Sequence, residues 1–270
     1  MYKLDKGLES ALKNVKYFLL DLDGTLYLEG KPIGDMVNTL EYIRKTGRKL
    51  VYLTNNSSKG TETYVERLTN IGFYKEGDLV YSSGTASAEY LNRYYPGKKV
   101  YVLGTDSFKA QLKLNGVNLT EGLDADVALL GYDTELTYKK LCDFVRNVHR
   151  GATYIATHPD NNCPAEEVYI PDAGSYIKMI ETSNGFTPEL IIGKPNSVMG
   201  ENLKIRFNES CDNAFMMVGD RLYTDIKFGL NCGFYSTLVL SGETTLEMQQ
   251  SSGVEPSFIL QSFNDIVNYL

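Results

Sequence analysis

KYFLLDLDGTL, at residues 16–26, is the stretch that decides the fold of this 270-residue chain. Its apolar run at 17–20 stops at two carboxylates, Asp21 and Asp23, with a glycine and a threonine directly after them. A short apolar run that ends in a glycine turn predicts a strand buried on both faces of a sheet. In open α/β sheets, ligands bind at the carboxyl ends of the strands, which is where these two acids lie.

Two carboxylates this close together repel each other, and burial of either one without a partner is costly. A hard cation such as Mg²⁺ would offset that cost, because it prefers oxygen ligands. The pattern therefore indicates a metal-assisted site in which Asp21 is a candidate nucleophile. A solvated Asp-Gly turn is the plain alternative, and the other motifs of the chain bear on the choice.

The composition is that of an ordinary globular protein of one or two domains. The chain has 43% hydrophobic and 23% charged residues and a formal net charge of -7, and roughly three-quarters of the unfolded surface is buried at this length. The acidic balance argues against nucleic acid as a partner, because phosphate backbones require clustered Lys and Arg. A small phosphorylated metabolite is compatible with it, since one lysine and one metal ion can neutralise a phosphate.

The cysteines and the chain's start indicate a cytoplasmic protein. The cysteines are scattered and form no CxxC pair, at Cys142, Cys163, Cys211 and Cys232. Neither a zinc site nor a redox motif is predicted, and we expect reduced thiols. The first residues are charged rather than apolar, so no signal peptide is predicted, and no apolar run approaches the ~20 residues of a membrane helix. We expect no membrane partner.

Strands and helices alternate along the chain. Strands are predicted at 17–20, 50–53, 79–81, 100–103, 127–130, 154–156, 190–192, 215–218, 237–240 and 258–260, and helices at 1–15, 36–46, 61–70, 107–114, 138–149, 175–182, 197–207 and 264–270, with a further helix that runs through 228. This alternation predicts an α/β fold with a doubly wound parallel-sheet core. We interpret residues 84–187 as a smaller α/β domain inserted into a core formed by 1–83 and 188–270.

Four strands outside the insertion end in polar groups of complementary kinds. These are Asp21 and Asp23, Thr54 and Asn55, Lys194, and Asp220 with Asp225. If the four strands are parallel in one sheet, all four ends meet at one edge. Phosphoryl transfer requires such a set: a nucleophile, a cation, and donors to the phosphate oxygens. Each motif alone fits an ordinary loop or capping turn, but their joint occurrence favours a catalytic site.

In this order, the four motifs resemble those of the haloacid dehalogenase (HAD) superfamily of phosphohydrolases. DLDGT is similar to the first motif, LTNNSS to the second, GKPN to the third and GDRLYTDI to the fourth. The predicted insertion lies between the second and third motifs, where this superfamily carries its type-2 cap. The resemblance points to subfamily IIA, the NagD and p-nitrophenyl phosphatase-like proteins, and it extends more weakly to YIATHPD and PDAGS in the cap.

The resemblance implies a role for each matching residue. Asp21 matches the nucleophile that forms an aspartyl-phosphate, and Asp23 matches the general acid that later activates water. Thr54 and Asn55 match the pair that binds phosphate through a hydroxyl and a backbone N–H. Lys194 matches the lysine that neutralises the nucleophile and the phosphate.

A magnesium site is implied in the same way. Asp21, the backbone carbonyl of Asp23, and Asp220 match the protein ligands of Mg²⁺. Asp225 matches the acid that supports the metal's water or Lys194. Hard oxygen ligands with several retained waters suit Mg²⁺.

The loop at 158–172 holds the remaining candidates. His158, Asp160 and Cys163 could form a metal cluster by residue type, but they lack a recognised ligand spacing. In the family this part of the cap faces the active site, so His158 and Asp160 are candidates for substrate contact. Asn commonly occupies the position of His158 in the family, and this departure bears on any substrate carried over from a close relative. His149 lies at a predicted helix end, where the helix dipole explains it.

The resemblance implies a Mg²⁺-dependent phosphatase that acts on a small phosphomonoester. The substrate classes it suggests are nucleotides, sugar phosphates, phosphoglycolate and pyridoxal phosphate. A phosphomutase uses the same acids, and a non-catalytic binding or regulatory protein could keep the fold, so both alternatives stay open. A dehalogenase would not need Asp23. Relatives form cap-to-cap dimers, so a homodimer through the cap is allowed but not required.

Overall fold

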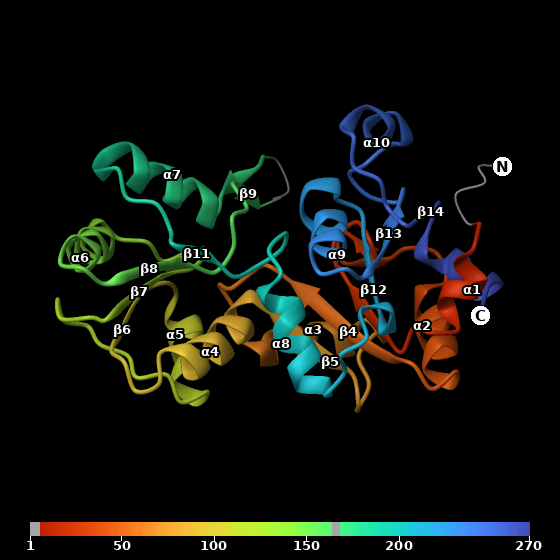
Figure 1. Cartoon of the computed structure of the whole chain (residues 1–270), viewed down its shortest axis with the longest axis horizontal. Coiled ribbons are helices and arrows are strands. Elements are labelled where there is room, and N and C mark those ends of the chain that lie inside the picture. The colour runs from red at the N-terminus through yellow and green to blue at the C-terminus, as the bar shows by residue number, and fades with distance from the viewer. Residues whose placement is uncertain (1–5, 164–167) are drawn as a thin grey trace. The chain divides into compact units, whose positions relative to one another are not determined.

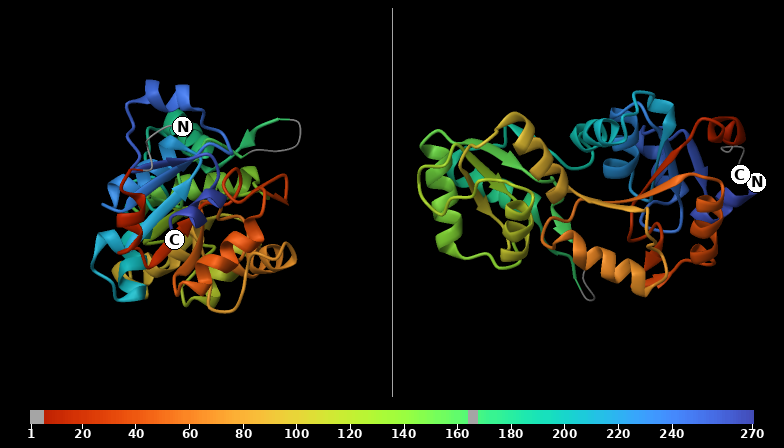
Figure 2. Two further views of the ribbon diagram at one scale, coloured as in Figure 1. Left: turned by 90° about the vertical axis from the view of Figure 1, so that its right-hand side faces the viewer. Right: turned by 90° about the horizontal axis from the view of Figure 1, so that it is seen from below.

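The structure is a computed structural model that describes residues 6–163 and 168–270. Contacts between Cα atoms divide the chain into two compact units. The first unit comprises residues 1–54, 64–81 and 194–270, and the second comprises residues 55–63 and 82–193. Each unit is built around its own parallel sheet (Figures 1 and 2).

The sheet of the first unit has six strands in the order β14-β13-β12-β1-β4-β5. The strands are β1 (Tyr17–Leu20), β4 (Lys49–Thr54), β5 (Leu79–Ser82), β12 (Phe215–Gly219), β13 (Tyr235–Val239) and β14 (Phe258–Leu260). The strands from β14 to β4 are parallel, with Leu20 in register with Val218 on one side and Tyr52 on the other. Their carboxyl ends meet at one edge, and the predicted parallel-sheet core is confirmed.

Helices cover both faces of this sheet. The helices of this unit are α1 (Leu8–Leu12), α2 (Met36–Lys45), α3 (Thr61–Asn70), α8 (Val198–Phe207), α9 (Lys227–Asn231) and α10 (Leu246–Ser252). Phe18 and Met216 are fully buried in the cluster that α1, α2 and α3 form on one face. The preceding residue in β1, Tyr17, points to the opposite face and stacks on Phe207 of α8, with ring centroids 4.3 Å apart. Burial on both faces explains why these strands read as continuous apolar runs.

The second unit has a parallel sheet of four strands in the order β11-β8-β7-β6. Its elements are β6 (Val100–Leu103), β7 (Val127–Leu130), β8 (Thr153–Ala156), β11 (Leu190–Ile191), α4 (Ser83–Tyr94), α5 (Asp106–Leu114), α6 (Tyr138–His149) and α7 (Ala173–Asn184). Leu130 and Tyr154 pack with Phe144 of α6 and Ile180 of α7, and α4 and α5 lie on the other side of the sheet from α7 (Figure 1). The predicted second α/β sheet is confirmed, while the exact domain boundaries at 84 and 187 stay a prediction.

Several local elements differ from the predictions. Among the described residues, the helix expected over 1–15 is confined to α1, and residues 1–5 lie outside the description. The closing helix is a 3-10 turn, η3 (Phe263–Asn268), and the helix through 228 begins as a π-helical turn, η2 (Leu222–Ile226). In the part of the chain that the structure describes, no helix combines the length and the apolar character needed to cross a membrane.

The sequence pattern does not predict α4, α10 or two short hairpins. The hairpins are β2 (Tyr27–Leu28) with β3 (Lys31–Pro32), and β9 (Asn162–Cys163) with β10 (Ile170–Pro171). α4 begins SGTASA, which lacks a stripe of large apolar side chains. It is specified instead by its N-cap, where the Ser82 hydroxyl accepts from the Thr85 N–H.

The prediction that four strand ends meet at one edge of a single sheet is wrong for the strand before Lys194. β11 pairs with β8 of the second unit, with Leu190 opposite Ile155 and Ile191 opposite Ala156. With two residues, β11 is too short for its apolar pattern to show which sheet it joins. The ends of β1, β4 and β12 do share one edge, because these strands are neighbours in the first sheet.

Candidate active site

Three predicted site residues lie at the carboxyl edge of the first unit's sheet. Asp21 follows β1, Thr54 is the last residue of β4, and Asp220 follows β12. β1 lies between β4 and β12, so parallel pairing alone brings these three positions together. The Asp21 side chain is 17% exposed, whereas Asp220 is buried.

Lys194 lies between two acids. Its Nζ is 2.6 Å from Oδ1 of Asp21 and 2.7 Å from Oδ1 of Asp225. Lys194 and Asp225 are both almost completely buried. Burial alone would lower the pKa of Lys194, but the charges of Asp21 and Asp225 outweigh it and hold that pKa above its usual range. Lys194 is therefore a fixed positive charge beside Asp21.

Close backbone approaches hold the Asp220 carboxylate. A Cβ atom on Gly24, whose φ is +83°, would come 2.3 Å from Oδ2 of Asp220, and one on Gly242 would come 2.0 Å from the same atom. The Glu243 N–H donates to this oxygen at 2.7 Å. Only glycine leaves room for the carboxylate at these two positions.

The acids around Lys194 carry more negative charge than one lysine offsets. Burial and the charge of Asp21 raise the pKa of Asp220 to about 6 and that of Asp225 to about 7, although Lys194 acts to lower the second. Carboxylate oxygens of Asp21, Asp220 and Asp225 lie within 4.8 Å of one another. This oxygen-only set and its excess charge fit a hard divalent cation, which these acids could hold.

Asp23 lies on a tight turn after β1. The Gly24 N–H donates to the Tyr27 carbonyl at 2.9 Å and closes the turn. The Tyr27 hydroxyl donates to Oδ2 of Asp23 at 3.2 Å, and an Arg67 nitrogen lies 3.9 Å from Oδ1. Partial burial and the charge of Asp21 raise the pKa of Asp23, while Arg67 and the Tyr27 hydroxyl oppose this. Because the Asp23 side chain is 63% exposed, solvent screening limits each of these effects.

Asn55 follows Thr54 directly in the chain but belongs by its contacts to the second unit. Its side chain is buried, and its amide donates to Oδ2 of Asp160 at 3.1 Å. Its carbonyl accepts from the Ser83 hydroxyl at the start of α4. The candidate phosphate-binding pair thus lies where the chain passes from one unit to the other.

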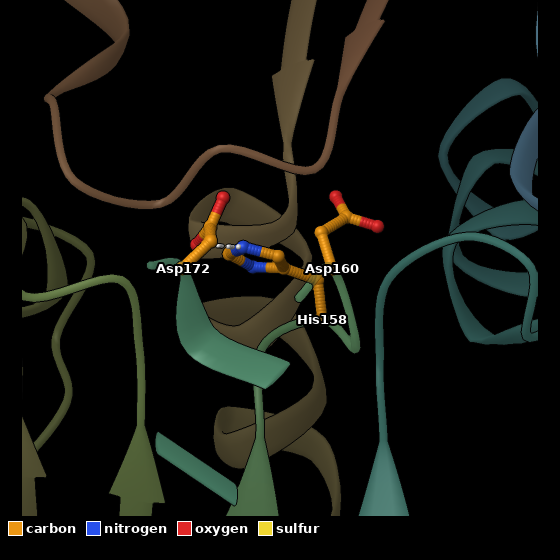
Figure 3. Close-up of side chains that lie close together, drawn as sticks. All are labelled: His158, Asp160 and Asp172. Atoms are coloured by element: carbon orange, nitrogen blue, oxygen red, sulfur yellow. Dashed lines mark hydrogen bonds and ion pairs between the residues drawn. The ribbon is translucent and has the colours of Figure 1, made fainter. Parts of the chain in front are cut away.

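His158, Asp160 and Asp172 lie close together in the second unit (Figure 3). His158 is fully buried, with Nε2 2.9 Å from Oδ1 of Asp172 and Nδ1 2.9 Å from the Thr157 hydroxyl. The same Asp172 oxygen caps α7 by accepting from the Ala173 N–H at 2.6 Å. Because both ring nitrogens have partners, we interpret His158 as the anchor of its loop to α7.

Three residues that shape these groups were missed by sequence reasoning. Tyr27 and Arg67 contact Asp23 on its turn. Asp172 pairs with the buried His158. Of the three, only Asp172 carries a sequence signal, since an Asp before an apolar helix is a typical N-cap. Cys163, which residue type groups with the histidine, lies in β9 instead.

The chain matches known protein families along both units. A family model described as haloacid dehalogenase-like hydrolase matches residues 18–118, and a second HAD-like model matches residues 191–266. The acid sugar phosphatase of Staphylococcus aureus is 32% identical over 257 residues, which are 95% of this chain and 98% of that protein.

Solved structures agree with these sequence matches. A 4-nitrophenylphosphatase from Thermotoga maritima matches with a TM-score of 0.90 and 37% identity, over 96% of this chain and 98% of that one. A putative NagD protein matches with a TM-score of 0.87 and 37% identity, over 95% and 98% of the two chains. The similarity therefore includes the second unit as well as the sheet that carries the acids.

Proposed function

The chain belongs to the haloacid dehalogenase-like hydrolases, as a phosphatase of the branch that contains NagD and the p-nitrophenyl phosphatases, and we propose that it hydrolyses small phosphomonoesters with Mg²⁺ through an aspartyl-phosphate. The observation that carries this proposal is the position of Lys194 between Asp21 and Asp225, at 2.6 and 2.7 Å. A carboxylate at a strand end, with a fixed cation on one of its oxygens, is poised for attack on a phosphate that its own charge would otherwise repel.

In the first step, Asp21 attacks phosphorus. A bond forms between an Asp21 oxygen and phosphorus, and the bond from phosphorus to the ester oxygen breaks. Lys194 offsets the negative charge that meets there, while the Thr54 hydroxyl and the Asn55 backbone N–H donate to the phosphate oxygens. Asp23 gives its proton to the leaving oxygen.

In the second step, water attacks the phosphorus of the aspartyl-phosphate. Asp23, now a carboxylate, takes the proton of that water, and phosphate and free Asp21 are formed. One group thus serves as acid and then as base. The 63% exposure of the Asp23 side chain supports this assignment, because the group must reach a leaving group and then a water molecule.

Asp21, Asp220 and the carbonyl of Asp23 are the groups we assign as protein ligands of Mg²⁺, with Asp225 in support. When bound, the cation supplies charge neutralisation to the phosphoryl oxygens during transfer. The raised pKa values of Asp220 and Asp225 support the fit, since burial and the charge of Asp21 disfavour the ionised carboxylates, which a divalent cation would stabilise.

We assign the role of the cap to the second unit, with Asp160 as its substrate contact. His158 has both ring nitrogens engaged, so we assign it to holding the loop rather than to contact. A carboxylate favours a hydroxyl-bearing partner over a second anion. Sugar phosphates therefore lead the nucleotide, phosphoglycolate and pyridoxal phosphate classes, in line with the sugar phosphatase relative. A homodimer through the cap remains part of the proposal, which includes no nucleic acid or membrane partner.

The test is phosphate release from a panel of these esters and p-nitrophenyl phosphate, with Mg²⁺ and with EDTA. We expect metal-dependent release that Asp21→Asn abolishes, and a ranking with sugar phosphates first. Transfer of the phosphoryl group to a second sugar position without release would favour a mutase. No turnover by a folded protein that binds Mg²⁺ would favour a binding or regulatory role.

A further inference from the structure

Asp23 has a contact on each carboxylate oxygen, and both contacts come from residues outside every motif. The Tyr27 hydroxyl donates to Oδ2 at 3.2 Å, and an Arg67 nitrogen lies 3.9 Å from Oδ1. The two partners also contact each other, since the guanidinium carbon of Arg67 lies 4.6 Å from the centroid of the Tyr27 ring. All three residues belong to the first unit.

Tyr27 is a rigid donor. Its side chain is fully buried, and its ring packs against Phe73 with centroids 6.3 Å apart. Its backbone is tied to the turn, because its carbonyl accepts from the Gly24 N–H and it forms a β-bridge with Asp23. Burial and the charge of Asp23 raise the pKa of Tyr27 far above its usual range, so the hydroxyl keeps its proton at neutral pH.

Arg67 acts on the other oxygen through charge rather than through a hydrogen bond. A separation of 3.9 Å is too long for a hydrogen bond but short enough for Coulomb attraction. In the described ranges, Oδ1 of Asp23 receives no hydrogen bond, whereas Oδ2 is occupied by Tyr27. Oδ1 is therefore the oxygen that can carry the proton that Asp23 transfers, and the positive charge of Arg67 lies beside it.

We propose that Tyr27 and Arg67 are positioning residues that make Asp23 a directed proton donor, with Oδ1 as the oxygen that delivers the proton. This role rests on the proposed phosphatase function. The O–H bond at Oδ1 breaks, and the proton binds the leaving oxygen as the bond from that oxygen to phosphorus breaks. Arg67 offsets the charge left on Asp23, and the hydrogen bond at Oδ2 stops the carboxylate from rotating. Water returns a proton to Oδ1 in the second step.

The test compares two leaving groups. p-Nitrophenolate leaves readily without a proton, whereas an alkoxide leaves poorly unless it is protonated, so the alkyl ester depends far more on the acid. We would measure kcat/KM for p-nitrophenyl phosphate and for an alkyl phosphate that the protein turns over, chosen from glycerol phosphate and hexose 6-phosphates. This constant is used because it reports the steps up to the first irreversible one.

Tyr27→Phe should lose about ten-fold more activity on the alkyl ester than on the nitrophenyl ester. Arg67→Gln should lose about three-fold more, because solvent screens the charge of a 45% exposed side chain, and Arg67→Lys should recover part of that loss. Asp23→Asn removes the acid itself and should show the largest difference between the two esters, with a loss of kcat/KM about 100-fold or more greater for the alkyl ester. Arg93→Gln is the matched control, because Arg93 also lies over a tyrosine ring, 5.9 Å from the centroid of Tyr94, but belongs to the second unit. It should change neither rate constant.

Equal losses on the two esters would mean that Tyr27 and Arg67 only support the fold, and would overturn the positioning role. Unchanged rates in both variants would overturn it as well. Thermal melts of each variant show whether a loss comes from unfolding, and recovery by Arg67→Lys separates charge from packing. Absence of turnover of either ester by the unmodified protein is a distinct result, because it overturns the proposed function itself.

Discussion

The Nζ of Lys194 lies 2.6 Å from Oδ1 of Asp21, although 173 positions separate the two residues in the chain. Asp21 follows a central strand of the first unit's sheet, whereas Lys194 comes shortly after β11, which belongs to the sheet of the second unit. The lysine therefore reaches the acid from the segment by which the chain returns to the first unit. It also pairs with buried Asp225, so a single cation serves two carboxylates.

Lys194→Met should abolish turnover and destabilise the fold. Loss of one partner from a buried ion pair costs about 3–5 kcal/mol, and loss of one charge stabiliser should lower kcat by at least about 100-fold. Urea unfolding and phosphate release measure the two effects. Lys204→Met is the control, since its ion pair with Asp212 is partly exposed and should contribute less than about 1 kcal/mol. Unchanged stability of Lys194→Met would contradict the buried charge arrangement.

Sequence reasoning works for the part of the site that lies at strand ends. Asp21 and Asp220 directly follow β1 and β12, and Thr54 ends β4. Strands buried on both faces are apolar throughout, so their ends are easy to locate in a sequence. Parallel pairing then brings the three positions to one edge, and no knowledge of side-chain packing is needed.

Contacts made away from strand ends could not be predicted in this way. Lys194 follows a strand of two residues, whose apolar pattern does not specify a sheet. Tyr27 and Arg67 meet at the acid of the turn from a hairpin and a helix, and Asp172 meets His158 where α7 packs against a loop. These contacts depend on tertiary packing, which hydrophobic periodicity does not report.

Stability should depend on pH and on a divalent cation together. Burial and the charge of Asp21 raise the folded-state pKa to about 6 for Asp220 and about 7 for Asp225. A carboxyl group with a raised folded pKa contributes stability that is fully present below its unfolded pKa and is lost as pH rises through the folded value. In EDTA, Tm should therefore fall between about pH 4 and pH 7.

Magnesium should reverse this loss, because it favours the ionised acids. Thermal scans with EDTA and with Mg²⁺ should show a larger rise in Tm at pH 7.5 than at pH 5. The Asp220→Asn variant is the control and should lose most of the Mg²⁺-dependent shift. An equal shift at both pH values would count against a cation site made of these carboxylates.

Gly24→Ala should cost more than its backbone conformation alone explains. The φ of +83° is unfavourable for alanine, and the added Cβ would lie 2.3 Å from Oδ2 of Asp220. Gly253→Ala is the matched control, since Gly253 has a similar φ of +68° and nothing within 4 Å of the added atom. We expect about 1–2 kcal/mol for the control and about 2–5 kcal/mol for Gly24→Ala, because the clash adds to the strain.

Displacement of Asp220 should also weaken the metal dependence of turnover in Gly24→Ala. Chemical denaturation and Mg²⁺ titration of phosphate release measure the two consequences. An equal loss of stability in the two alanine variants, with an unchanged Mg²⁺ response, would mean that Asp220 can move aside without cost. That outcome would contradict the close packing of Gly24 and Gly242 around its carboxylate.

Asp172→Ala should combine the loss of a helix cap with the loss of a buried hydrogen-bond partner. The cap on α7 contributes about 1 kcal/mol, and the His158 nitrogen left without Asp172 inside the protein adds about 1–3 kcal/mol. Thr245→Ala removes a cap from the exposed start of α10, together with a hydrogen bond to the exposed Glu247 but with no buried partner group, and should cost about 1 kcal/mol. The difference between the two variants in free energy of unfolding, measured with urea, gives the contribution of the contact with His158.

The loop that the contact between His158 and Asp172 anchors also carries Asp160. Further contacts with α7 fix the position of Asp160. The Gly174 N–H of α7 donates to the Asp160 carbonyl at 2.7 Å, and a Cβ on Gly174 would lie 2.2 Å from the Pro159 carbonyl oxygen. Asp172→Ala should therefore raise KM for the preferred ester more than it lowers kcat, because the acids of the first sheet keep their own contacts. A fall in kcat at constant KM would instead mean that the loop takes part in the chemical step.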